Sequence, residues 1–271
     1  MAHQWWGHQV IPADVLGAKM IVESLAEYVN IKVKEKEKGV DKMRKFLKYN
    51  LEQYLQMRNQ HPRQESPLMF VNPDENYISY PKGSNVFYTL SDYLGDKQWN
   101  NAIKTYVEKV QFQENVYTTS IELVEHIKKH VPDSLQYLIR DMFETVTLYD
   151  NKIVDWSSQE LSNGKYEIKI QLSVRKYRNG KNGKELYTDE LELDSISFQS
   201  PAMEKPIYSL PLADYIDLGI FSEAKKEIFL EKIKVNQINN SISIIVDEKP
   251  TEVAIDPYYK LIDRELIDNW K

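Results

Sequence analysis

The chain has 271 residues, of which 42% are hydrophobic, so it can form a large core and its length favours two domains over one. The net charge of -6 and the lack of a basic stripe exclude a nucleic-acid partner, and the absence of Cys excludes disulfides, thiolate metal ligands and a Cys nucleophile. No run of 18 or more apolar residues predicts a transmembrane segment in this chain, and the compartment stays unknown.

Residues 1–147 are expected to form a helical domain, because Gly is scarce there and apolar residues recur three and four positions apart. One long helix is predicted from Asp14 to Lys38 with Gly39 as its C-terminal cap, and a second helix is predicted to begin at Asp41. The prolines within residues 60–80 predict a long loop. The further predicted helices cover residues 82–93, 96–112, 119–130 and 132–145.

Residues 148–271 are expected to form a small antiparallel β-sandwich. Apolar and polar residues alternate over 166–172 and 242–246, and Leu191 and Leu193 show the same alternation. The Asn- and Gly-rich residues 179–183 predict a turn between two strands. The predicted fold class is therefore α+β, with a helical domain followed by the sandwich.

Two residues of the helical half have side chains of the kind that bind zinc. His3 precedes an aromatic-rich turn, and Glu23 lies within the predicted long helix on a face that is otherwise apolar. A carboxylate on such a face must form a pair, bind a metal or have a raised pKa. Taken singly, each residue is more often structural, since a lone Glu is usually hydrogen-bonded and a lone terminal His usually has no role.

The longer strings around these residues resemble the gluzincin-type zinc aminopeptidases, a family that includes alanyl aminopeptidases and leukotriene hydrolase. The strings are His3-Gln4-Trp5-Trp6-Gly7, then Pro12, then Glu23-Ser24-Leu25-Ala26-Glu27-Tyr28. In that family the zinc motif H-E-x-x-H precedes Gln-Trp-Trp-Gly, and a Glu about one helix downstream is the third zinc ligand. The resemblance implies that His3 corresponds to the second His of the motif and Glu23 to the downstream Glu.

A second motif, Tyr80-Pro81-Lys82-Gly83, resembles the family's Tyr-x-Lys-Gly. The resemblance implies that Tyr80 hydrogen-bonds the tetrahedral oxyanion beside the zinc. It also implies that the full-length parent uses zinc to hydrolyse N-terminal residues from peptide substrates. The resemblance covers the helical half closely and the sandwich half more loosely, through residues 251–257.

Four shorter strings resemble a bacterial subgroup of the family in which the peptidase is fused behind a transporter-like permease. This narrower resemblance implies that the full-length parent is tethered to a membrane. The strings are His8-Gln9-Val10-Ile11, Gly17-Ala18, Phe143-Glu144-Thr145 and Leu148-Tyr149-Asp150-Asn151.

The chain also departs from the family pattern. It lacks the first His of the zinc motif and the adjacent Glu, which is the general base. Two ligands in place of three should bind zinc weakly or not at all, so we expect the 271 residues by themselves to be inactive. The interval from His3 to Glu23 is one residue longer than the commonest family spacing, and a small bulge near the helix would absorb the extra residue.

Several alternatives remain open from the sequence. His8 could replace the missing His beside His3 and Glu23, His126 and His130 have metal-like spacing on one helix, and Glu27 either orients His3 or lies on the surface. The whole chain also has an alternative interpretation as a non-catalytic interaction or scaffold module derived from the family. In both interpretations we expect self-association through surface that the missing parts of the family fold would cover.

Overall fold

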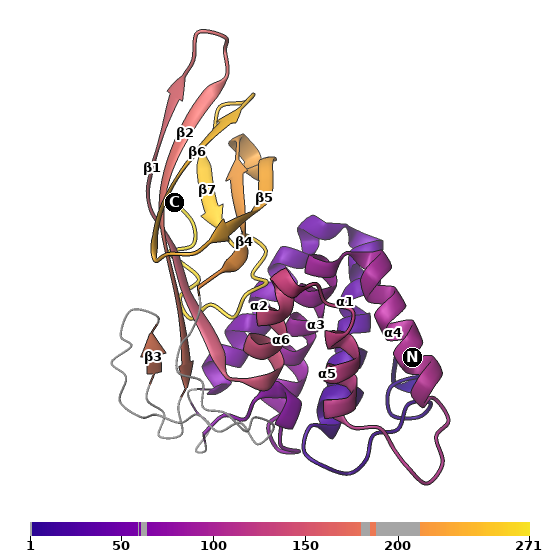
Figure 1. The fold of residues 1–271 in the computed structure, drawn as a ribbon. Coiled ribbons are helices and arrows are strands. Elements are labelled where there is room, and N and C mark those ends of the chain that lie inside the picture. The colour runs from indigo at the N-terminus through magenta and orange to yellow at the C-terminus, as the bar shows by residue number, and fades with distance from the viewer. Residues whose placement is uncertain (1, 59, 61–63, 180–184, 188–211) are drawn as a thin grey trace. The chain divides into compact units, whose positions relative to one another are not determined.

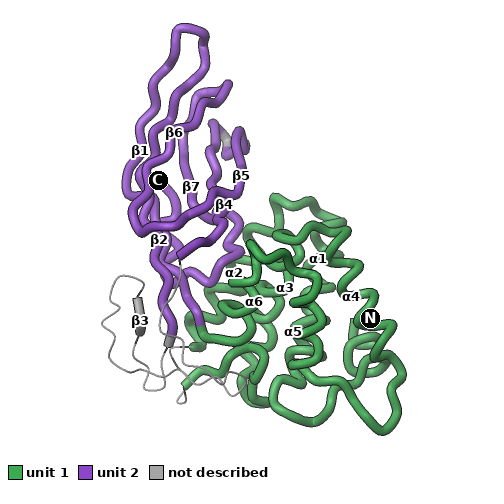
Figure 2. Tube along the Cα trace, in the orientation of Figure 1, with its two compact units in different colours: residues 1–146, 200–203 green, residues 147–199, 204–271 purple. Residues whose placement is uncertain are grey.

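The computed structural model describes residues 2–58, 60, 64–179, 185–187 and 212–271, whose helices and strands are shown in Figure 1. The described residues form two compact units, which meet in sequence between Val146 and Thr147 (Figure 2). The first unit is helical and the second is built from antiparallel strands, so the α+β fold class is confirmed. The assignment of residues 1–147 and 148–271 as separate domains stays a prediction. In the described part of the chain, no helix has the length and apolar character needed to cross a bilayer.

The helical unit consists of α-helices joined by short 3-10 and π-helical turns. The α-helices are α1 (Leu25–Lys38), α2 (Val40–Arg58), α3 (Gly83–Leu94), α4 (Asp96–Val110), α5 (Ser120–Lys128) and α6 (Gln136–Ile139). The π-helical turns are Met20–Ser24, Ile78–Lys82 and Arg140–Glu144, and the 3-10 turns are Ala2–Gln4, Leu68–Phe70 and Asp133–Leu135.

Two of the predicted helices differ from the structure. The helix predicted from Asp14 begins only after Gly17, whose φ of +86° is a left-handed conformation that an α-helix cannot contain. A Cβ at Gly17 would lie 2.1 Å from the Met69 carbonyl oxygen, so the chain turns here because glycine permits a close approach. The helix predicted over 132–145 is divided into a 3-10 turn, α6 and a π-helical turn.

Helix α3 occupies the centre of the helical unit, with its residues from Gly83 to Ser91 buried. A cluster of aromatic rings packs on it: Phe87 of α3 lies 6.0 Å from Trp99 of α4 and 5.4 Å from Phe143, measured between ring centroids. Tyr28 of α1 meets Trp99 edge to face at 5.7 Å. Such contacts bury large apolar areas and hold α1, α3 and α4 in fixed positions.

The second unit contains two antiparallel sheets, as the alternation of apolar residues predicted. In one sheet, β2 (Tyr166–Asn179) pairs with β1 (Thr147–Glu160), β3 (Glu185–Tyr187) and β6 (Asn239–Val246). In the other, β4 (Asp214–Phe221) lies between β5 (Glu227–Val235) and β7 (Glu252–Ile255). Leu191, Leu193 and the turn predicted over 179–183 lie partly or wholly outside the described residues.

The core of the β unit contains a buried aspartate, Asp256, directly after β7. Its two carboxylate oxygens accept hydrogen bonds from the backbone N–H groups of Lys260 and Leu261 at 3.0 and 2.9 Å. Burial raises the pKa of Asp256 to about 7, and the nearby Asp217 carboxylate adds to this effect against the opposing backbone donors. Asp217 itself is paired with Lys260 at 2.7 Å.

Candidate active site

The two predicted site residues that are distant in sequence, Glu23 and Tyr80, each lie in a π-helical turn. Glu23 belongs to the turn Met20–Ser24 that precedes α1, and Tyr80 belongs to the turn Ile78–Lys82 that precedes α3. A π-helical turn contains more residues per turn than an α-helix, and such turns are frequent at functional sites. The turn Met20–Ser24 therefore accommodates one extra residue between His3 and Glu23, as the bulge expected from the sequence would.

These two turns lie against each other, and this contact places Glu23 next to Tyr80. The Ser24 hydroxyl donates a hydrogen bond to the Ser79 carbonyl oxygen at 2.5 Å. Gly83 makes the close approach possible, because a Cβ at this position would lie 2.1 Å from Ser24 Oγ and 2.6 Å from Ser24 Cβ. The Tyr-Pro-Lys-Gly string therefore ends in glycine because a side chain at position 83 would overlap Ser24.

The phenol of Tyr80 lies close enough to the Glu23 carboxylate for that group to affect its pKa. Burial and the neighbouring carboxylates of Glu23 and Glu27 raise the pKa of Tyr80 to about 12. The phenol therefore keeps its proton at neutral pH and remains a hydrogen-bond donor.

His3 faces Glu23 with one nitrogen while its other nitrogen is fixed by the backbone. His3 Nδ1 lies 3.3 Å from the Trp6 carbonyl oxygen, which can only accept, so Nδ1 carries the proton in this contact. In the neutral ring Nε2 then presents its lone pair toward Glu23 Oε2, 3.6 Å away. Two acceptors facing each other fit a shared cation, and the pairing of an imidazole nitrogen with a carboxylate oxygen suits zinc.

This site is open on the His3 side and enclosed on the Glu23 side, since the exposed fraction of the side chain is 51% for His3 and 17% for Glu23. Next to it, the residues around Tyr80 line a hollow of about 270 Å³. Its walls come from α1, α2 and the turn Ile78–Lys82, and they include Glu27, Tyr49, Asn50, Gln53, Tyr77 and Tyr80.

The other candidates from the sequence do not complete a metal site with His3 and Glu23. Among the described residues no group of three His, Cys, Asp or Glu side chains could hold a metal ion, so His8 does not complete the pair. Glu27 accepts a hydrogen bond from Asn30 at 3.2 Å. Of the two adjacent tryptophans, Trp6 is buried, whereas Trp5 is about half exposed.

His126 and His130 lie side by side, with 5.1 Å between their ring centroids. His126 Nε2 lies 3.0 Å from both the Ala102 carbonyl oxygen and the Thr105 hydroxyl. Since the carbonyl only accepts, Nε2 carries a proton and is not available to a metal in this arrangement. Burial lowers the pKa of His126, which agrees with a neutral, packed ring.

Sequence reasoning missed a buried ionic cluster directly behind the Tyr80 turn. Lys82 and Glu65 are almost completely buried, with Lys82 Nζ 2.6 Å from Glu65 Oε1. The second Glu65 oxygen accepts from Arg58 Nε at 2.5 Å, and the Tyr54 hydroxyl donates to Oε1 at 2.7 Å. A Lys at the start of a helix whose only charged residue is Asp92 was the available signal, because a buried cation requires a carboxylate.

Burial alone would raise the pKa of Glu65, but the charges of Lys82 and Arg58 more than offset it and hold this pKa below its usual range. Glu65 is therefore an anion in the folded protein. It connects the end of α2 to the turn that carries Tyr80.

Comparison with known proteins bears on the family and on the fold. Residues 1–145 match the protein family described as "Peptidase family M1 domain". No match is found among the curated proteins. The solved structure of aminopeptidase A from Legionella pneumophila in complex with aspartic acid superposes with a TM-score of 0.53 at 12% identity, over 96% of this chain and 25% of that chain. This likeness shows the fold.

A mutant of the M1 zinc metallopeptidase from Deinococcus radiodurans, bound to a Tyr-Ser-Ala substrate, has a TM-score of 0.41 at 19% identity, over 52% of this chain and 31% of that chain. The chain thus spans between a quarter and a third of the length of these two proteins. The family match covers more than half of the 271 residues. The chain therefore belongs to peptidase family M1.

Proposed function

We propose that this chain provides one side of the zinc centre of an aminopeptidase that removes N-terminal residues from peptides. The observation that supports this most directly is the pair of facing acceptors, His3 Nε2 and Glu23 Oε2, with the Tyr80 phenol close to the same carboxylate. Membership of the family and the likeness to an aminopeptidase fold support the same reaction class.

Each of the three residues has a separate task in this proposal. His3 and Glu23 would hold the metal, which when bound supplies a Lewis acid that polarises a peptide carbonyl. The Trp6 carbonyl keeps the His3 ring in the tautomer that leaves Nε2 free to bind. Tyr80, protonated at neutral pH, donates a hydrogen bond to the negative charge that develops on the carbonyl oxygen.

The 271 residues by themselves are proposed to be inactive, because they supply two zinc ligands and no general base beside them. A third ligand and that base would come from a His-Glu pair encoded directly before Met1. The first test is therefore the reading frame upstream of Met1, which should encode this pair in the whole protein. If apolar spans are encoded further upstream, the proposed tethering to a membrane is supported as well.

The second test is activity of the longer polypeptide on an aminoacyl anilide. Tyr80→Phe should lower kcat about 100-fold or more with little change in KM, since it removes a donor to the developing oxyanion. Tyr117→Phe, at an exposed tyrosine in the α4–α5 connection, is the matched control and should have no effect. Full activity of Tyr80→Phe, or zinc-dependent cleavage by the 271 residues that is lost in Glu23→Ala, would overturn the corresponding part of the proposal.

A reading frame that starts at Met1 would instead favour the interaction or scaffold module. Self-association is also part of our proposal, and it rests on apolar side chains such as Val15 and Leu16, which are half exposed near the zinc-ligand segment. An elution volume that does not change with protein concentration would argue against it.

A further inference from the structure

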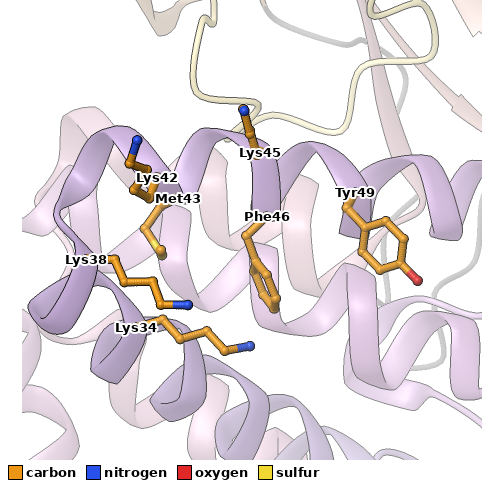
Figure 3. Close-up of a pocket in the computed structure, with 7 residues that line it drawn as sticks. All are labelled: Lys34, Lys38, Lys42, Met43, Lys45, Phe46 and Tyr49. Carbon is orange, nitrogen blue, oxygen red and sulfur yellow. The ribbon is translucent and has the colours of Figure 1, made fainter.

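A second hollow, of about 640 Å³, lies between the end of α1 and the first half of α2. Its floor is apolar and includes Met43 and Phe46, and the exposed Tyr49 also lines it. Lysines of both helices complete the lining, namely Lys34, Lys38, Lys42 and Lys45. In Figure 3 the side chains of Lys34 and Lys38 extend from α1 toward Phe46, whereas those of Lys42 and Lys45 extend from α2 in the opposite direction. We call this hollow the lysine groove.

The four lysines have no carboxylate partner among the described residues, although the chain carries a net charge of -6. Neighbouring lysines on the same helices are paired, as Lys32 is with Glu35 at 2.8 Å and Lys48 is with Glu52 at 3.6 Å. Lys34 Nζ instead lies over the Phe46 ring, 4.0 Å from its centroid. The groove thus combines several unneutralised cations with an aromatic floor, which favours a ligand that is both acidic and partly apolar.

The lysine groove adjoins the hollow beside Tyr80, because Tyr49 lines both. Along α2, Gln53 of that hollow is four positions from Tyr49 and eleven positions from Lys42 of the groove, which is about 6 and 16 Å at ~1.5 Å per residue. An extended peptide covers these distances with about two and five residues at ~3.3 Å each. A peptide whose N-terminal bond lies near Tyr80 would therefore place about its third to sixth residues in the groove.

We propose that the lysine groove binds the distal part of peptide substrates, and that it selects peptides with acidic residues and one aromatic residue at about positions three to six. This inference rests on the proposed function for the direction of the peptide, since an aminopeptidase holds the first residue at the metal. The groove would add affinity and length preference without contact with the reacting bond.

The shape favours a peptide over a membrane surface. Phe46 and Met43 lie at the floor between two helices, with Met43 buried, so a flat bilayer would meet the lysines but not this floor. An extended peptide with one side chain directed into the groove contacts both the lysines and the apolar floor. Electrostatic attraction at such an exposed rim weakens as salt is added, so binding is expected to be salt-dependent.

The experiment measures binding of a labelled ten-residue peptide to the 271-residue chain by fluorescence anisotropy at low salt. The peptide begins with alanine and carries Glu-Phe-Glu-Glu at positions three to six, and a second peptide carries Lys in place of each Glu. The double charge reversal Lys34→Glu with Lys38→Glu should weaken binding of the acidic peptide about tenfold or more. The control reverses two exposed lysines elsewhere, Lys97→Glu with Lys129→Glu, and changes the net charge equally.

Equal weakening by both double variants, or equal binding of the two peptides, would overturn the inference. Binding of the chain to vesicles containing phosphatidylserine, without binding of the acidic peptide, would overturn it in favour of a membrane surface. The proposed function is tested separately, because it fails if His3 and Glu23 do not bind zinc. If the protein binds no zinc but binds the acidic peptide in a way that depends on Lys34 and Lys38, peptide binding by the groove is supported and the proposed enzymatic function is rejected.

Discussion

The buried cluster behind Tyr80 allows a quantitative prediction about stability. Lys82→Met removes a cation whose side chain is 1% exposed and leaves Glu65, 3% exposed, without its closest partner. Removal of one member of a buried ion pair costs about 3–5 kcal/mol. Arg58 still contacts Glu65 in this variant, so the free energy of unfolding should fall by about 3 kcal/mol. Glu65→Gln leaves Lys82 without a carboxylate and should cost more, about 5 kcal/mol.

Thermal unfolding followed by circular dichroism at 222 nm reports on the helical unit, where a loss of about 3 kcal/mol lowers Tm by roughly 10 °C. The control is Lys104→Met, which breaks an exposed pair with Glu108 at 3.7 Å and should change stability by less than about 0.5 kcal/mol. Because the pKa of Glu65 is lowered on folding, its stabilisation is present at neutral pH and is lost as the pH falls below about 4.

The reasoning is refuted if Lys82→Met unfolds within 2 °C of the Lys104→Met control, or if Lys82→Met costs more than Glu65→Gln. The double variant should lose less than the sum of the two single variants, because each single change already breaks the shared contact.

Three further predictions concern packing, protonation and helix capping. Gly83→Ala should cost about 1–3 kcal/mol because its Cβ would overlap Ser24, and Ser24→Gly should recover part of this loss in the double variant; additive losses in denaturant unfolding would refute the close contact. Because the pKa of Asp256 is raised to about 7 on folding, the contribution of Asp256 to the stability of the β unit should be largest below about pH 4 and fall by up to about 4 kcal/mol as the pH rises to 7. Hydrogen exchange in the strands should therefore show a flatter pH profile for Asp256→Asn. Thr119→Ala removes the oxygen that accepts from the Glu122 N–H at 3.2 Å and should lower stability by about 1 kcal/mol, whereas Thr119→Ser should retain most of it.

Much of the fold follows from local patterns in the sequence. Gly39 ends α1 with a φ of +87°, and α2 begins within one residue of the predicted start at Asp41. The alternation of residues over 166–172 and 242–246 identifies β2 and β6. These features depend on the propensities of a few neighbouring residues, which the sequence displays directly.

The remainder depends on contacts between distant residues. The helix predicted from Asp14 starts later because Gly17 packs against the Met69 backbone, more than fifty positions away. The cluster of Lys82 with Glu65 and Arg58 was not predicted for the same reason, since no local pattern reveals which carboxylate neutralises a buried lysine.

The members of the candidate site were proposed from two motifs, which name His3, Glu23 and Tyr80. The π-helical turns that position Glu23 and Tyr80 have no distinctive local pattern, so the geometry of the site could not be predicted. The proximity of Tyr80 to Glu23 follows only from the packing of these turns. The roles of the three residues stay predictions until metal binding is measured.

The most direct test of the zinc centre is a zinc titration of the 271-residue chain followed by the NMR signals of its histidine rings, which detects even weak binding. We predict that His3 responds, that its response is lost in Glu23→Ala, and that it is retained in Glu37→Ala, a control at an exposed glutamate of α1. An unchanged His3 response in Glu23→Ala, or a stronger response of His126, would contradict the assignment of His3 and Glu23 as zinc ligands.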